Sequence, residues 1–294
     1  MQFNLQSCFK TYALPLAFVV GAALSLAFAP FGVWPLAILC PAVLFLAWQG
    51  VAAKRAAMIG FWFHAGTFLA GTYWLYHSVH TIGGAPIWLA IALMLALVSI
   101  MGGYLALMGY LQARWLPATG VLRWCVGLPA LWVLVEWWRG WFLSGFPWLS
   151  LGYAQIDSPL AGWVPVVGVY GVSLICVMVS GALVALVHSP RSLRKVIVGA
   201  MCLPFVMGMA LRYHEWTRPL DAPVSFAVVQ ASVPQDYKWS PEWRDKTLSL
   251  YRTLAAPYFG TPLIIWPEAA LPDLSYELTD YLSELWGDAH RAHS

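Results

Sequence analysis

The stretch from Ile87 to Leu111 reads IWLAIALMLALVSIMGGYLALMGYL and contains no charged residue. A transmembrane α-helix needs about 20 consecutive, mostly apolar residues, so this stretch predicts a membrane span. Comparable apolar runs recur on both sides of it, at 13–29, 33–48, 56–75, 121–138, 162–187 and 196–211. The sequence therefore predicts an α-helical membrane bundle of about seven spans.

The composition of the whole chain supports the same conclusion. Hydrophobic residues make up 61% of the sequence and charged residues 10%, whereas soluble domains are about 25% charged. A chain of 294 residues that is this apolar cannot hide its side chains in one core, so the bilayer must solvate many of them. The net charge of +3 gives no indication of a nucleic-acid partner.

Charged residues divide the chain into two parts. Of the 13 acidic residues, only Glu136 and Asp157 precede residue 213. A composition shift this abrupt marks a domain boundary. We predict a transmembrane helical domain over residues 1–212 and an extramembrane domain over residues 213–294.

Basic residues in the short loops predict the orientation of the spans, because cytoplasmic loops carry an excess of Lys and Arg. One set of alternating loops, at 30–32, 76–86 and 139–161, contains a single Lys or Arg, which is Arg139. The other set and the N-terminus hold Lys10, Lys54, Arg55, Arg114, Arg123, Arg191, Arg194 and Lys195. This bias predicts a cytoplasmic N-terminus and places 213–294 outside, in the periplasm of a Gram-negative cell.

Residues 213–294 show the pattern of an α/β domain. The β-branched run 224–229 and the apolar run 263–266 predict two buried strands. Residues 231–241 are expected to form a loop, and apolar spacing predicts helices over 242–256 and 276–292. Strands joined through a helix are usually parallel, so we predict the opening unit of a parallel sheet.

Two positions could carry chemistry. Glu268 follows Trp266-Pro267 at the carboxyl end of the second predicted strand, where α/β sheets bind ligands. Partial removal from water would suit this carboxylate to general-base catalysis; the alternative is an ordinary loop carboxylate. Glu136 and Arg139 are close enough on one helix to form an ion pair, or else they could hold a lipid headgroup.

Several short stretches together resemble one enzyme family. The segment Leu263–Pro272, LIIWPEAALP, resembles the first catalytic motif of the nitrilase superfamily and is closest to the apolipoprotein N-acyltransferases. Other similar stretches follow in family order: Ala29-Pro30 with Val33-Trp34-Pro35, Arg139-Gly140-Trp141, GFPWL at 145–149 before Gly152-Tyr153, and Val229-Gln230 with Pro234-Gln235 and Lys238-Trp239.

The resemblance implies a multi-pass enzyme of the bacterial inner membrane with a periplasmic nitrilase-like αββα domain and no metal or cofactor. Such enzymes transfer an acyl chain from a phospholipid to the N-terminal S-diacylglyceryl-cysteine of lipoproteins, through a thioester on an enzyme cysteine. The resemblance implies that Glu268 is the general base and that Trp239 lies on a loop near the site. It places the loop residues Phe146, Pro147 and Trp148 close to the lipid entry.

The chain departs from the family pattern in its catalytic residues. The family's Lys and Cys follow the Glu, but Lys238 and Lys246 precede Glu268 and no cysteine follows Cys202. Without a thiol there is no nucleophile to activate. We therefore expect a truncated chain whose residues 213–294 are the incomplete start of the nitrilase-like domain, catalytically incomplete by itself. The alternative is a non-catalytic lipid-binding membrane remnant or scaffold; a transporter is disfavoured because the spans lack charges at their centres.

Overall fold

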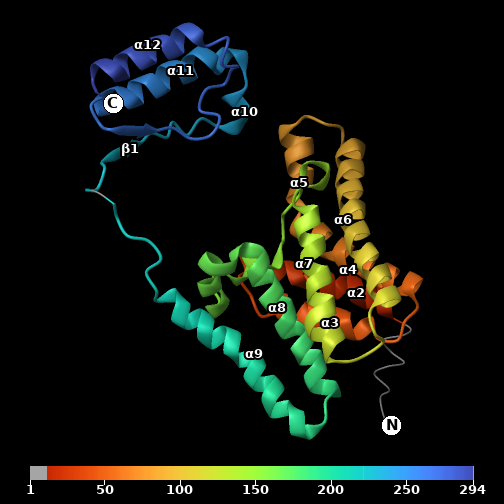
Figure 1. Ribbon diagram of the computed structural model, residues 1–294. Coiled ribbons are helices and arrows are strands. Elements are labelled where there is room, and N and C mark those ends of the chain that lie inside the picture. The colour runs from red at the N-terminus through yellow and green to blue at the C-terminus, as the bar shows by residue number, and fades with distance from the viewer. Residues whose placement is uncertain (1–11, 221, 294) are drawn as a thin grey trace. The chain divides into compact units, whose positions relative to one another are not determined.

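The computed structural model describes residues 12–220 and 222–293. The chain divides into two compact units, residues 1–216 and 217–294 (Figure 1). The predicted division after residue 212 falls at the end of helix α9 (Arg191–Arg212).

Unit 1 contains no strand among its described residues. Its elements are α2 (Ala13–Leu24), η1 (Ser25–Ala27), α3 (Leu36–Ala47), α4 (Ala53–Gly71), α5 (Trp74–His77), η2 (Ser78–Ile82), α6 (Ile87–Trp115), η3 (Arg123–Gly127), α7 (Leu128–Arg139), η4 (Phe142–Ser144), η5 (Leu151–Gln155), η6 (Pro159–Trp163), α8 (Val164–His188) and α9. Each predicted apolar run overlaps one of the longer helices, namely α2, α3, α4, α6, α7, α8 or α9.

Three helices of the described chain are long and apolar enough to cross a membrane: 87–115, 159–188 and 191–212. They support a membrane setting for unit 1. Helices α2, α3 and α7 have 12 residues each, which at 1.5 Å per residue gives about 18 Å. That is less than the hydrocarbon thickness of about 30 Å, so the count of seven spans stays a prediction.

Small residues allow α4 to approach α2 and α6 closely. A Cβ atom on Gly66 of α4 would lie 2.1 Å from the carbonyl oxygen of Phe18 of α2. A Cβ atom on Gly60 would lie 2.4 Å from the carbonyl oxygen of Leu105 of α6. Backbone contact through small residues is the usual way in which helices associate in membranes. Helix α4 thus lies against both α2 and α6.

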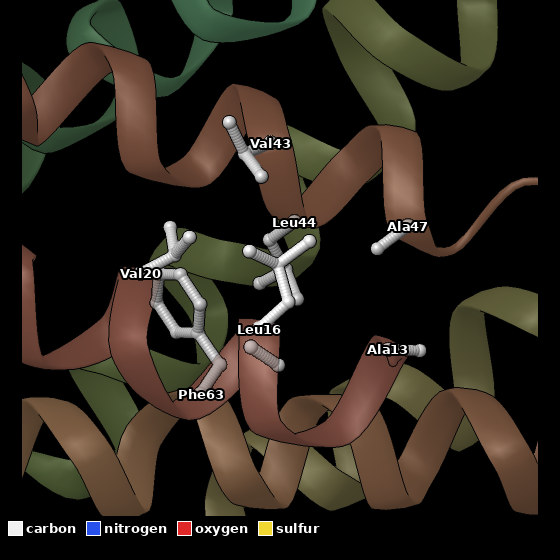
Figure 2. A pocket seen from close by; sticks show the side chains of 8 residues that line it. Ala13, Leu16, Val20, Val43, Leu44, Ala47 and Phe63 are labelled. Carbon is white, nitrogen blue, oxygen red and sulfur yellow. The ribbon is translucent and has the colours of Figure 1, made fainter. Parts of the chain in front are cut away.

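Helices α2, α3 and α4 enclose only a small gap. Figure 2 shows Leu16 of α2 near Leu44 of α3, with the ring of Phe63 from α4 beside Val20. The gap has a volume of about 10 Å³ and its lining is entirely apolar. A cavity needs about 10–15 Å³ and polar partners to hold one water molecule, so this gap is a packing defect rather than a ligand site.

Unit 2 is an α/β unit with a two-stranded sheet. Its elements are β1 (Phe226–Val228), α10 (Gln235–Lys238), α11 (Pro241–Ala255), η7 (Ala256–Tyr258), β2 (Leu263–Ile265) and α12 (Thr279–Arg291). Strands β1 and β2 are parallel, with Ala227 opposite Ile264, which confirms the predicted orientation. The short helix α10 occupies part of the segment that was expected to be loop. Two strands are common to many α/β folds, so the nitrilase-like fold stays a prediction.

The sheet of unit 2 has one covered and one open face. On the covered face, Val229 packs with Tyr251 and Ala255 of α11. On the other face the side chains are exposed, although all are apolar: Phe226, Val228, Leu263 and Ile265. Ion pairs from Arg252 to Glu284 and to Asp288, both at 2.6 Å, join α11 to α12.

Candidate functional site

Arg139, the last residue of α7, is a buried anchor for the loop that follows it. Its Nη1 atom donates hydrogen bonds to the carbonyl oxygens of Phe146 at 2.7 Å and Trp148 at 2.5 Å. Its Nη2 atom donates to the Oγ atom of Ser150 at 3.1 Å. The guanidinium also lies 5.2 Å above the ring of Phe68. Hydrogen bonds to a charged donor are stronger than neutral ones, so this side chain fixes the path of the loop.

Glu136 holds the far end of the same loop. Its Oε1 atom accepts hydrogen bonds from the Nε1 atom of Trp132 at 2.9 Å and from the backbone nitrogen of Leu151 at 3.0 Å. Glu136 and Arg139 are both buried, yet no ion pair joins these two described residues. The predicted ion pair is therefore wrong. The helical spacing allows the contact, but the folded loop supplies closer partners to both side chains.

The loop itself follows a strained path. Leu143, Ser144 and Leu149 have φ angles of 53°, 73° and 58°, a region that residues other than glycine rarely adopt. Gly145 has a φ of 77°, and a Cβ atom there would lie 2.1 Å from the carbonyl oxygen of Gly140. Such strain persists only where surrounding contacts impose it, and it gathers at functional sites.

A pocket of about 680 Å³ lies beside this loop. Its volume falls in the range of about 300–1,000 Å³ that is typical of small-molecule sites. Three segments far apart in sequence line it: Ser25, Ala27–Gly32, Ala70, Gly71, Tyr73, Trp74, Pro147–Leu149, Tyr153, Ala154, Ile156 and Asp157. The Ala29-Pro30 stretch and the GFPWL stretch, both noted in the sequence, thus meet at one pocket.

The three loop residues of the predicted site have different positions. Pro147 and Trp148 line the pocket, but Phe146 does not. The ring of Phe146 stacks on that of Trp148 with centroids 6.2 Å apart, and it packs on Phe68 at 6.1 Å. Phe146 therefore supports the pocket wall from behind.

Trp74 and Asp157 are among the pocket residues that the sequence motifs did not indicate. Trp74 lies against Trp148 with ring centroids 5.8 Å apart, and no local pattern connects these positions. Asp157 is exposed and lies on the pocket lining. A signal for Asp157 was present, because Asp157 and Glu136 are the only carboxylates between residues 12 and 212.

In unit 2, Glu268 follows β2 and its side chain is exposed. The expected partial removal of this carboxylate from water is therefore not found. Helix α11 covers the sheet face through Tyr251 and Ala255, whereas Glu268 lies beyond the end of β2. The Nζ atom of Lys238 lies 3.5 Å from the backbone oxygen of Glu268. The neighbouring Trp239 is 60% exposed. Unit 2 thus brings the segment with Trp239 next to the segment with Glu268.

A smaller pocket of about 150 Å³ lies at this point of unit 2. Lys238 and Pro267 line it together with Thr247 and Tyr251 of α11. Its position at the carboxyl end of β2 is where α/β sheets place their ligand sites. The arrangement offers one ammonium group, that of Lys238, together with the hydroxyl groups of Thr247 and Tyr251.

Comparisons with known proteins point to one family. The family model described as the apolipoprotein N-acyltransferase N-terminal domain matches residues 20–182, a range that includes every residue lining the larger pocket. Three proteins named apolipoprotein N-acyltransferase are similar to the chain. The one from Pseudomonas putida is 40% identical over 283 residues, which cover 95% of this chain and 56% of that protein.

The relative from Azotobacter vinelandii is 41% identical over 280 residues, covering 92% of this chain and 53% of that protein. The relative from Vibrio cholerae is 38% identical over 270 residues, which cover 90% of this chain and 52% of that protein. The chain spans about half the length of the curated relatives it matches. Because the family model matches more than half of its residues, the chain belongs to the apolipoprotein N-acyltransferase family.

Proposed function

We propose that this chain provides the membrane-embedded, phospholipid-binding part of an apolipoprotein N-acyltransferase, together with its first catalytic segment. The reaction moves an acyl chain from a phospholipid to the α-amino group of the S-diacylglyceryl-cysteine at the N-terminus of a lipoprotein. The observation that carries this proposal is that the family match over 20–182 contains the whole 680 Å³ pocket and the loop that Arg139 holds.

The proposed setting is the bacterial inner membrane, with seven spans, a cytoplasmic N-terminus and residues 213–294 in the periplasm. The distribution of Lys and Arg among the loops supports this orientation. The pocket-lining segments 25–32, 70–74 and 147–157 fall at the ends of spans that lead into the loops poor in basic residues. The pocket would then open at the outer membrane–water interface, where the lipoprotein substrate is found.

In the proposed chemistry, Glu268 is the general base. An enzyme thiol would attack the ester carbonyl of the phospholipid while Glu268 takes the thiol proton and passes it to the departing lysophospholipid oxygen. In the second half, Glu268 would deprotonate the incoming amine, which attacks the thioester and releases the thiol. Its carboxylate is exposed, which leaves room for both partners to approach. Trp239 would border that approach, because the adjacent Lys238 contacts the backbone oxygen of Glu268.

Residues 203–294 contain no cysteine, so the thiol of this scheme is absent from the extramembrane part described here. We therefore propose that the 294 residues bind the acyl donor but do not form the thioester by themselves. The second candidate function, a non-catalytic lipid-binding module, is favoured by one observation. The larger pocket is lined by residues of unit 1 alone and needs nothing from Glu268.

The test uses the purified 294-residue chain in detergent micelles with a fluorescent-acyl phospholipid and a synthetic diacylated lipopeptide. We expect retained phospholipid, no acyl-enzyme thioester and no N-acylated peptide. Formation of N-acylated peptide would contradict the catalytic incompleteness. Failure to retain any phospholipid would contradict the donor-binding role of unit 1.

A further inference from the structure

The larger pocket of unit 1 contains a single unneutralised carboxylate. Asp157 lines the pocket, and no Lys, Arg or His of the described chain lies within ion-pair distance of it. The other carboxylate of the helical part, Glu136, is buried and bound to Trp132 and Leu151. Asp157 is therefore the carboxylate that unit 1 presents to a ligand in this pocket.

Aromatic side chains accompany this carboxylate. Trp74 and Trp148 lie against each other at 5.8 Å, and Tyr73 and Tyr153 also line the pocket. All four are exposed, so their rings are available to a ligand. The faces of such rings attract cations, and they combine with a carboxylate in sites that hold ammonium groups. Apart from Ser25, the remaining lining is apolar and suits the hydrocarbon part of a lipid.

The pocket offers little to an anionic group. No Lys or Arg lines it. Among Lys and Arg, the nearest to the lining in sequence is Arg139, which donates both terminal nitrogens to the loop, so its charge is already bound to loop oxygens. A phosphate placed beside Asp157 would meet like charge without a compensating donor. The electrostatics of the pocket therefore favour a positively charged group beside Asp157.

We propose that Asp157, with the rings of Trp74 and Trp148, binds the primary ammonium group of an amphiphilic substrate. The assignment rests on the proposed function, because it deepens the role of the same pocket. Two substrates of that reaction class can carry this group, namely the headgroup of an aminophospholipid and the free α-amino terminus of a diacylated peptide. In either case Asp157 is a specificity-determining residue of unit 1.

The experiment compares matched pairs of ligands that differ by one N-acetyl group, which removes the positive charge of the amine. Short-chain phosphatidylethanolamine is compared with its N-acetyl derivative, and a diacylated lipopeptide with its N-acetyl derivative. Binding to the 294-residue chain in detergent is measured by native mass spectrometry. The variants are Asp157→Asn and, as a matched control, Glu215→Gln, which removes the same charge from an exposed position outside the pocket.

We expect the wild-type chain and Glu215→Gln to prefer the free amine of one pair by roughly tenfold, the size of a cation–π contact joined to an ion pair. Asp157→Asn is expected to bind both members of that pair equally. The pair that shows the preference identifies the source of the ammonium group. Equal binding within both pairs, or a preference that survives Asp157→Asn, would overturn the assignment while leaving lipid binding intact. Absence of binding by all four ligands would overturn both this assignment and the proposed function.

Discussion

Glu136 and Arg139 lie one helical turn apart at the end of α7 and bind opposite ends of the same loop instead of each other. Arg139 donates to the carbonyl oxygen of Phe146 at 2.7 Å, and Glu136 accepts from the backbone nitrogen of Leu151 at 3.0 Å. One helix end thus fixes the entry and the exit of the segment that carries Trp148 into the pocket. Four predictions follow from this arrangement and from the charges of unit 2.

Replacing Arg139 with Lys will loosen the loop although the positive charge remains. A lysine ammonium also has three N–H donors, but they share one nitrogen. The guanidinium instead reaches Phe146 and Trp148 from Nη1 and Ser150 from Nη2, a planar fork that lysine cannot reproduce. We expect a loss of about 2–4 kcal/mol in the free energy of unfolding, because buried carbonyl oxygens lose their partners. Thermal unfolding in detergent and protease cleavage within 142–149 measure the effect. The matched control is Arg114→Lys at an exposed position, and equal melting of the two variants would contradict the anchoring role.

Gly145→Ala will disturb the same loop through its backbone. The added Cβ atom would lie 2.1 Å from the carbonyl oxygen of Gly140, at a φ of 77°. A cost of about 1–3 kcal/mol is expected for such overpacking and strain. Gly103→Ala on α6 is the control, since a Cβ atom there meets nothing within 4 Å. A melting temperature for Gly145→Ala as high as that of Gly103→Ala would show that the loop has another path.

Trp148→Ala will reduce the phospholipid that stays with the purified chain. The change removes a pocket wall and the contact with Trp74 at 5.8 Å. We expect a several-fold drop in bound lipid per chain, because truncation of an aromatic side chain that contacts the ligand costs about 1–3 kcal/mol. Lipid phosphorus per mole of protein gives the measurement. Trp115→Ala, at a position 70% exposed and outside the pocket, should keep its lipid, and an equal loss in both variants would argue against a specific site.

Acid will loosen the contact between α11 and α12 in unit 2. A hydrogen bond from Arg252 holds the pKa of the Asp288 carboxyl below its ordinary value. Because folding lowers this pKa, the contact stabilises the folded form at pH values above the ordinary Asp pKa of about 4. This stabilisation is lost as the pH falls through the lower pKa of the folded state. Hydrogen exchange of the α12 amides, corrected for the intrinsic effect of pH, should therefore accelerate below pH about 4.

Two variants separate this effect from general acid unfolding. Arg252→Gln removes the ion pairs to Glu284 and Asp288, so the exchange of α12 should already be fast near neutral pH and should change less with acid. Arg218→Gln removes the same charge from an exposed position and should behave like the wild-type chain. If acid accelerates exchange equally in all three proteins, the contact of Arg252 with Asp288 does not control it.

The local patterns of the sequence determined the elements and their order. The apolar run from Ile87 to Leu111 corresponds to α6 (Ile87–Trp115), and the runs near 224–229 and 263–266 contain the parallel strands β1 and β2. These features depend on the length and spacing of apolar side chains, which act within one helix or strand. The family resemblance of the short stretches in 20–182 was confirmed by the family match.

Only the tertiary structure decided which side chains meet. The spacing of Glu136 and Arg139 predicted a pair, but the folded loop offers each a better partner. The pocket joins Pro30, Trp74 and Asp157, which lie far apart along the chain, and the exposure of Glu268 depends on what the rest of unit 2 covers. Hydrophobic periodicity is a local property that the sequence displays directly. The partner of a buried charge or the wall of a pocket depends on where the chain turns back, and that is settled only when distant segments pack together.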